Sequence, residues 1–240
     1  MRIRPGRPMR GAAAVWLGAV ALGCGLINPN IFDTDIRLQR QVYSQDFGRN
    51  SGKVPAVPCS GQADTCQQVS SVVQGVPARG VCDPQSMRCQ AEASVTLSYP
   101  VNLSEDPAFQ SGVAGRAVQF VRAAELGYSL PINTLTFDIP EIEIYIGPQN
   151  ARNKTDPGVV LIGKVGPFTR GQTISDSAPM TLAIADGSPA RTQLEQNIKN
   201  PKAPFVFLIH AQPRISGGDD VPAGRMELHL FPKITVGLPR

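Results

Sequence analysis

Beyond residue 94 the chain is dominated by apolar residues at every second position. In the run 95–103, apolar residues at the odd positions alternate with Thr96, Ser98, Pro100 and Asn102. Successive side chains of a strand point to opposite faces of a sheet, so this alternation is typical of a strand with one buried face. Because Pro100 has no N–H to donate to a ladder, we expect this strand at the edge of its sheet.

Further apolar runs of strand length follow, separated by segments rich in Gly, Pro, Asn and Asp. Many short strands with such spacers favour a sandwich or barrel over alternating strands and helices. We therefore predict an all-β fold, a β-sandwich of roughly seven to nine antiparallel strands by the usual strand lengths and spacing. The expected strands lie within 118–130, 135–139, 142–146, 159–165, 180–184, 205–211 and 226–238.

One segment of this region has a helical pattern instead. Ser188-Pro189 is a typical cap and first residue of a helix, Leu194 and Ile198 are four residues apart, and Pro201 ends the pattern. We expect one short helix there. A further strand is expected from Ile36, Leu38 and Val42, ahead of the cysteine-containing segment.

Four cysteines are symmetrically spaced within a polar, turn-rich segment: Cys59, Cys66, Cys82 and Cys89. An even number of cysteines in an exported chain predicts disulfides, and four allow three connectivities. The spacing does not separate the three, and we take the crossed pairing, Cys59–Cys82 with Cys66–Cys89, as the working prediction. A four-cysteine zinc site is the alternative, but six residues between the members of each close pair is wide for a zinc knuckle.

The first 24 residues have the anatomy of an export signal. Four arginines precede an apolar stretch of 12 residues, 11–22, and Cys24 follows. A spanning helix needs about 20 apolar residues, so this stretch is too short to remain as an anchor. Two other interpretations stand beside the lipidated leader described next: an ordinary signal peptide that happens to precede a cysteine, and an uncleaved anchor.

The segment Ala21-Leu22-Gly23-Cys24 resembles the bacterial lipobox, although Leu is commonest at the position of Ala21 and a small residue at that of Leu22. The resemblance implies removal of residues 1–23, lipidation of Cys24 and anchoring in a membrane. Gly25 after the cysteine, rather than Asp, implies the outer membrane. With the short cysteine loops, the leader is similar to envelope lipoproteins of myxobacteria and their relatives, a likeness that implies no activity.

Removal of the leader would change the charge balance. The chain has 23 Lys and Arg against 19 Asp and Glu, and the leader contains four of the arginines and no acid. The processed chain would then be formally neutral. A nucleic-acid-binding domain needs a basic surface, so we do not expect a nucleic-acid partner.

Few residues suggest catalysis. His210 and His229 lie on two expected strands and would be neighbours if those strands paired, but a metal site needs a third ligand. Glu141 and Glu143 share one strand face about 7 Å apart, within the range of paired carboxylates in glycosidases. Such alternation is also common on solvated strands.

The acidic pairs Asp33 with Asp35 and Asp219 with Asp220 lack the spacing of a calcium loop, and no nucleophile elbow, phosphate loop or zinc-protease motif occurs. We expect no cofactor, no metal site and no catalytic set.

These patterns divide the chain into a leader, a tether with a first strand, a disulfide-stapled segment and the sandwich: 1–23, 24–56, 57–92 and 93–240. The stapled segment is either a separate domain or an insertion in the sandwich. Our leading interpretation is a lipid-anchored, non-enzymatic binding or assembly component of the cell envelope, with an unidentified protein or glycan partner. The alternatives are a carbohydrate-active or other hydrolase and a carrier with an apolar cavity.

Overall fold

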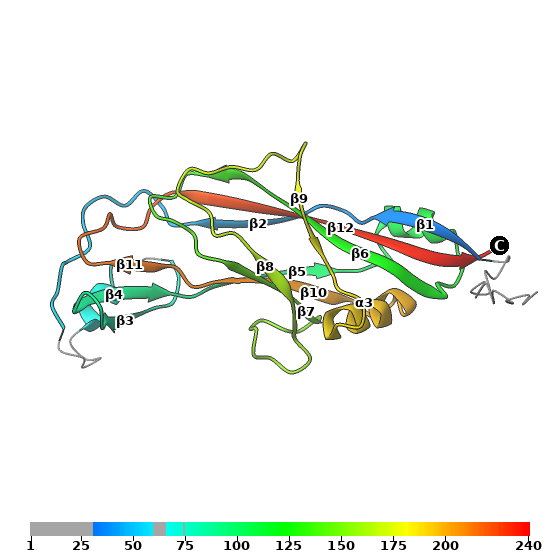
Figure 1. Ribbon diagram of the computed structural model, residues 1–240, viewed down its shortest axis with the longest axis horizontal. Coiled ribbons are helices and arrows are strands. Elements are labelled where there is room, and N and C mark those ends of the chain that lie inside the picture. The colour runs from blue at the N-terminus through cyan, green and yellow to red at the C-terminus, as the bar shows by residue number, and fades with distance from the viewer. Residues whose placement is uncertain (1–30, 60–65, 74) are drawn as a thin grey trace, which may run out of the picture.

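The computed structural model describes residues 31–59, 66–73 and 75–240. The predicted leader and Cys24 lie outside these residues. The fold is all-β, as expected, with nine strands in two sandwich sheets of five and four, a third sheet of three strands, and three helices. Figure 1 shows an elongated molecule with the small sheet at one end and the C-terminus at the other.

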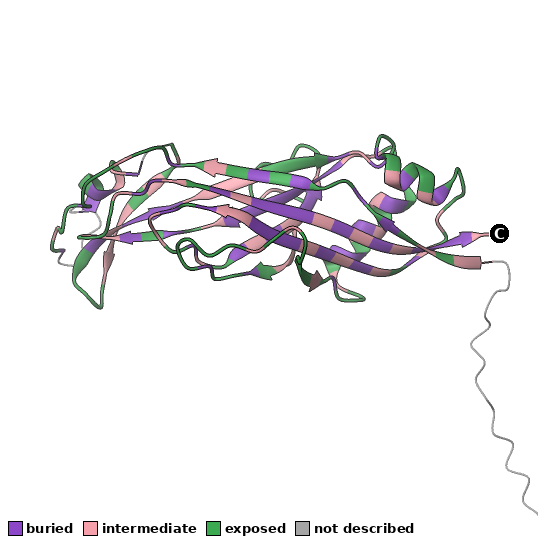
Figure 2. Ribbon diagram, turned by 90° about the horizontal axis from the view of Figure 1, so that it is seen from above, coloured by how far each residue is buried: buried purple, intermediate pink, exposed green. Residues whose placement is uncertain are grey.

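The five-stranded sheet is built around the longest strand. Its members are β1 (Ile31–Arg37), β2 (Gln41–Asp46), β6 (Phe120–Asn133), β9 (Met180–Ala183) and β12 (Arg225–Pro239). On one side β12 pairs with β1 and β2 in succession, and on its other side with β6, which carries β9. Alternate residues of β12 are buried over most of its length, as the banding in Figure 2 shows. The apolar residues at every second position therefore predicted this strand correctly.

The segment with Ile36, Leu38 and Val42, for which one strand was expected, differs from the prediction in two ways. The segment forms two strands, β1 and β2, rather than one. Tyr43 is buried in β2 and Val42 is among the exposed large hydrophobic residues, so the buried face is opposite to the one that Val42 predicted. Tyr43 reaches the second sheet, where its hydroxyl donates to the carbonyl oxygen of Phe207 at 3.2 Å.

The second sheet contains the most apolar strand of the chain. Its strands run in the order β5 (Val95–Val101), β10 (Phe205–Ala211), β7 (Ile142–Pro148) and β8 (Val160–Val165). β5 is an edge strand, as Pro100 predicted. Both faces of β10 are covered: Phe205, Phe207 and Ile209 join the main core, and Val206 and Leu208 form a small cluster on the outer face.

The expected helix is present as α3 (Pro189–Lys199), and the side chain of Ser188 accepts from the N–H of Arg191. A second helix, α2 (Pro107–Val113), was not anticipated. It starts in the same way, because Asp106 accepts from the N–H of Phe109 and Pro107 occupies the first turn. The third helix, α1 (Gln67–Ser70), is a single turn.

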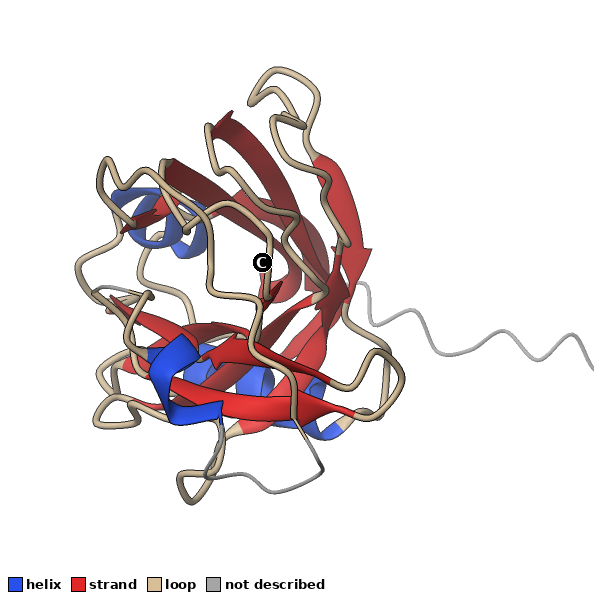
Figure 3. Cartoon of the chain, turned by 90° about the vertical axis from the view of Figure 1, so that its left-hand side faces the viewer, coloured by secondary structure: helices blue, strands red, loops and turns tan. Residues whose placement is uncertain are grey.

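The small sheet belongs to what we call the stapled module. Its strands are β11 (Arg214–Ser216), β4 (Arg88–Ala93) and β3 (Ala78–Asp83), in that order. The module is inserted between β2 and β5, but β11 comes from the segment between β10 and β12, so the main fold supplies one strand of the module's sheet. Figure 3 looks along the long axis with the module in front and α1 beside its strands.

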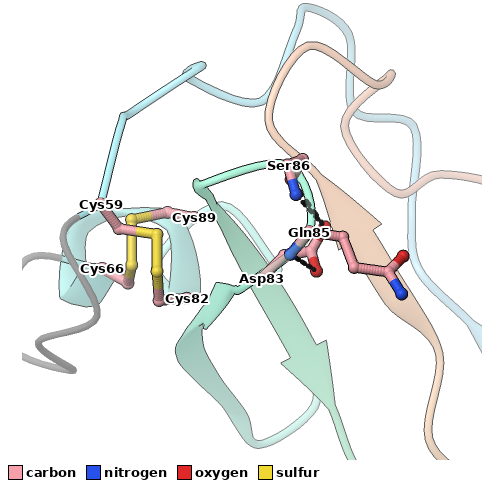
Figure 4. Close-up of a disulfide and its surroundings, with 7 residues drawn as sticks. All are labelled: Cys59, Cys66, Cys82, Asp83, Gln85, Ser86 and Cys89. Carbon is pink, nitrogen blue, oxygen red and sulfur yellow. Dashed lines mark hydrogen bonds between the residues drawn. A yellow bond between two sulfur atoms is a disulfide. The ribbon is translucent and has the colours of Figure 1, made fainter.

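The module's disulfides are crossed, Cys59–Cys82 and Cys66–Cys89, as in the working prediction. They lie side by side between α1, β3 and β4 (Figure 4). On the opposite face of the sheet, the buried carboxylate of Glu92 accepts from Arg79 at 2.6 Å and from Arg214 at 3.0 Å. This pairing joins all three strands of the module.

One apolar core runs from the sandwich into the module, since Cys66, Val69 and Ile215 belong to the same buried cluster as the sandwich core. A hollow at the module end of the core, lined by Phe47, Leu97 and others, has a volume of about 20 Å³. That is close to the space of one water molecule. This hollow cannot hold an acyl chain.

Candidate functional site

An open groove lies where the sandwich meets the module. It has a volume of about 530 Å³, and its polar lining comes from both parts of the molecule. We call it the junction groove and define it by Asp138, Glu141, Glu143, Lys164, His210 and Arg214. A second hollow of about 360 Å³ continues from it and shares Asp138 and Arg214. Binding sites favour such boundaries between structural units.

Strand pairing brings the polar side chains of the groove together. His210 of β10 pairs with Glu143 of β7, which pairs with Lys164 of β8, and Thr96 of β5 lies opposite His210 on the other side. Cross-strand partners point to the same face, so these four side chains form a row on the outer face of the sheet. Arg214 is placed by the separate pairing of β11 with β4.

Glu143 is held as a carboxylate. Lys154 and the Tyr145 hydroxyl donate to it at 2.8 and 2.7 Å, and Lys164 lies 3.4 Å away. The hydrogen bonds from Lys154 and Tyr145 outweigh burial and lower its pKa to about 2. Burial and the bond to Glu143 raise the pKa of Tyr145.

Lys164 connects the two glutamates that the sequence singled out. Its ammonium is 3.3 Å from Glu141 and 3.4 Å from Glu143, and the hydrogen bonds to these two residues raise its pKa. A glycosidase pair needs one carboxyl group whose raised pKa keeps it protonated as an acid. Glu143 has the opposite shift, so Glu143 cannot be the acid of such a pair.

His210 lies in the same row and is only 5% exposed. Its Nδ1 is 2.8 Å from the Thr96 hydroxyl, a contact that either ring tautomer can make. Its Nε2 has no hydrogen-bond partner in the described part of the chain. Burial, with a smaller contribution from Lys154, lowers the pKa of His210, so the imidazole is neutral at pH 7.

The two histidines are not neighbours, because β10 and β12 belong to different sheets. The arrangement considered from the sequence, with both histidines on one face, is therefore wrong. His229 lies on the outer face of the five-stranded sheet, where the segment 166–179 crosses it. We call this segment the strap.

Beneath the strap, a serine, a histidine and an aspartate meet without the geometry of a catalytic triad. His229 Nδ1 is 2.9 Å from Asp176, and the hydroxyl of Ser129 also donates to Asp176 rather than to the histidine. A triad needs the serine hydroxyl on the histidine, and Ser129 is fully buried. Burial opposes ionisation of Asp176, but the bonds from Ser129 and His229 prevail and lower its pKa.

These contacts fasten the strap to the sheet. Arg40 adds a salt bridge to Asp176 at 2.9 Å, and Ile174 of the strap pairs with Leu130 of β6. His229 Nε2 is 3.5 Å from Glu227, an electrostatic contact without the geometry of a hydrogen bond. We therefore assign this cluster a structural role.

The acidic pairs are occupied by contacts within the protein. Asp33 pairs with Arg122 at 2.8 Å, and Asp35 accepts from Thr235 at 2.6 Å. Asp219 accepts from the N–H of Ser216, and Asp220 pairs with Lys53. Neither pair brings together the six or more oxygen ligands that calcium takes.

Three cysteine sulfurs, those of Cys59, Cys66 and Cys89, lie within 4.8 Å of one another. All four cysteines of the module are joined in disulfides, which leaves no thiolate there to bind zinc. In the described residues, no helix is both long and apolar enough to cross a bilayer.

Several groove residues were not found from the sequence. Lys164 comes from β8 and Arg214 from β11, so each is remote in sequence from the glutamates. Lys154 contacts Glu143 from the loop before β8 but does not line the groove. The alternation at Glu141 and Glu143 marked the strand face correctly. Its cationic partners depend on long-range pairing, for which the sequence carries no signal.

Comparison with known proteins identifies no family. No family model matches the chain, and no curated protein matches it. Among solved structures, a chain of Mud Crab Dicistrovirus is similar over 100% of this chain and 81% of its own length, with 10% identity and a TM-score of 0.30. A chain of Israeli acute paralysis virus is similar over 100% of this chain and 80% of its own length, with 9% identity and a TM-score of 0.31. Scores this low carry no argument about fold or function.

Proposed function

We propose that the protein is an exported lipoprotein, anchored by lipid on Cys24, that acts as a non-enzymatic binding or assembly component of the cell envelope. The observation that carries the proposal is the pair of disulfides in the module. Disulfides persist in oxidising compartments, and the leader supplies the route there. The outer membrane is the proposed location.

The shape of the molecule is compatible with a tether at its N-terminal end. Ile31 pairs with Pro239 at the opposite end from the module (Figure 1). β12 runs from the module end to this end, about 45 Å at 3.3 Å per residue. The chain from Cys24 to Ile31 spans at most about 25 Å. A lipid on Cys24 would therefore hold the module on the side away from the bilayer.

The anchor is tested by metabolic labelling with radioactive palmitate in a Gram-negative host. We expect the wild-type chain to carry label and to fractionate with membranes, and Cys24→Ala to lose both properties. Globomycin, which blocks the lipoprotein signal peptidase, should leave the wild-type chain at its precursor mass. Labelling of Cys24→Ala, or a soluble and unlabelled wild-type chain, would refute the anchor.

The non-enzymatic part of the proposal is supported by the groove and by the contacts beneath the strap, where Ser129 donates to Asp176 rather than to His229. Lys154 and Tyr145 keep Glu143 ionised, so this residue cannot act as a protonated acid. A hydrolase that uses Glu141 and Glu143 would need one of them protonated at working pH. The alternative of an apolar carrier finds no support in the 20 Å³ hollow.

A further inference from the structure

We propose that the junction groove binds an uncharged, hydroxyl-rich oligosaccharide. This inference rests on the proposed role as a binding component and names its ligand class. It does not depend on the anchor. The argument uses the charges of the groove, the direction of its hydrogen-bonding groups and the residues at its rim.

Most charges of the groove are already paired within the protein, whereas Asp138 has no cationic partner among the described residues and accepts from the backbone N–H of Arg170 at 2.8 Å. Lys164 lies between Glu141 and Glu143, and Lys154 also donates to Glu143. Arg214 is paired with Glu92. A site for an anion or a cation would present unpaired charge of one sign to the ligand. Apart from Asp138, the groove presents alternating and mutually neutralised groups, which favours a ligand without net charge.

These paired groups are nevertheless fixed donors and acceptors. Glu143, with its lowered pKa, is an acceptor at every pH near neutrality, and Lys164, with its raised pKa, is a donor. A hydroxyl group can donate to the carboxylate and accept from the ammonium at the same time. Neighbouring hydroxyls of a sugar ring match such a row of acceptors and donors.

His210 adds a buried polar atom in need of a partner. Its Nε2 is buried and unbonded within the described residues, an arrangement that costs free energy unless a ligand or water satisfies it. Because the ring is neutral, Nε2 is a donor in one tautomer and an acceptor in the other. A hydroxyl satisfies both, whereas a carboxylate satisfies only the first.

The rim of the groove argues against an extended peptide as the ligand. Pro140 and Pro167 both line the groove. Proline has no N–H, so these positions cannot donate to the carbonyl groups of an added strand. Their rings instead offer apolar surface to the C–H faces of a sugar. Since the groove is open to solvent, we expect weak binding, with dissociation constants of about millimolar.

The test uses the purified full-length chain in detergent, so that failure of the anchor does not affect the result. Maltotetraose and chitotetraose are the neutral probes, tetragalacturonate the acidic one and tetraalanine the peptide. Binding is measured by saturation-transfer difference NMR with titration. We expect at least one neutral probe to bind about tenfold or more tightly than tetragalacturonate and tetraalanine.

Variants locate the binding. Lys164→Met and Glu141→Gln alter exposed side chains of the groove, and we expect each to weaken binding of the neutral probe about tenfold. Lys233→Met is the matched control, because Lys233 pairs with Asp35 on the outer face of the other sheet. Unchanged thermal unfolding shows that a variant has kept its fold.

The proposal is overturned if neither neutral probe binds, if the acidic probe or the peptide binds more tightly, or if Lys164→Met binds like Lys233→Met. A membrane-bound protein that binds no sugar refutes this inference and leaves the anchor standing. A soluble protein that binds the neutral probe refutes the anchor and leaves this inference standing.

Discussion

Removal of Cys66–Cys89 should destabilise the protein more than removal of Cys59–Cys82, although the two disulfides close loops of equal length. Both have a sequence separation of 23 residues. In the chain-entropy model, a loop of this size contributes about 3 kcal/mol. Loop entropy alone therefore predicts the same loss of stability for the two double-alanine variants.

The burial of the cysteine residues separates the two variants. Cys66 and Cys89 have 0% exposure, whereas Cys59 has 7% and Cys82 is only half-buried. Replacing a fully buried cysteine by alanine leaves a hole of about one atom, and each such hole costs about 1 kcal/mol. We therefore expect a loss of about 3 kcal/mol for Cys59→Ala/Cys82→Ala and about 4 to 5 kcal/mol for Cys66→Ala/Cys89→Ala.

Urea unfolding followed by circular dichroism measures both losses, and the slopes of the two curves must agree for the comparison to hold. Each variant is the control for the other, since loop length is the same. Equal losses would show that burial of the cysteine residues adds nothing, and a larger loss for Cys59→Ala/Cys82→Ala would refute the packing argument. Because one core joins module and sandwich, we also expect a single unfolding transition.

Two further changes test the groove and a helix cap. Glu143→Gln should cost about 3 kcal/mol at pH 7, because the carboxylate has a pKa of about 2 in the folded protein and 4.5 as a model group. This stabilisation is complete above pH 4.5 and is lost as the pH falls towards 2, so urea unfolding of both chains should converge over that interval; a difference that stays constant contradicts the assignment. Asp106→Ala removes the N-cap of α2 and the hydrogen bond from the N–H of Gln39, and should cost about 2 kcal/mol. Ser111→Ala, on the exposed side of the same helix, is its control, and equal effects in thermal unfolding would show that the cap is unimportant.

Local patterns predicted strands and helices well wherever a single residue restricts the backbone or its hydrogen bonds directly. Pro100 marked an edge strand because it lacks a donor, and Ser188-Pro189 marked the start of α3. The same reasoning applies to Asp106-Pro107, so α2 was within reach of the sequence.

Patterns failed where the outcome depends on what packs on the other side of a strand. Tyr43 rather than Val42 faces the core, because the register against β12 shifts by one residue between Arg37, opposite Lys233, and Gln41, opposite Leu230. The two histidines have the same local pattern, yet their strands enter different sheets.

The sequence by itself determined that the chain forms strands with buried faces and contains a cysteine-rich segment, because alternation and spacing express local geometry. Only the tertiary structure decided which strands pair. That pairing brings Lys164 between two glutamates, places Arg214 at the edge of the groove and lends β11 to the module. The physical reason is that pairing is set by the burial of whole faces over long sequence separations, and exposed charged residues contribute little to that choice.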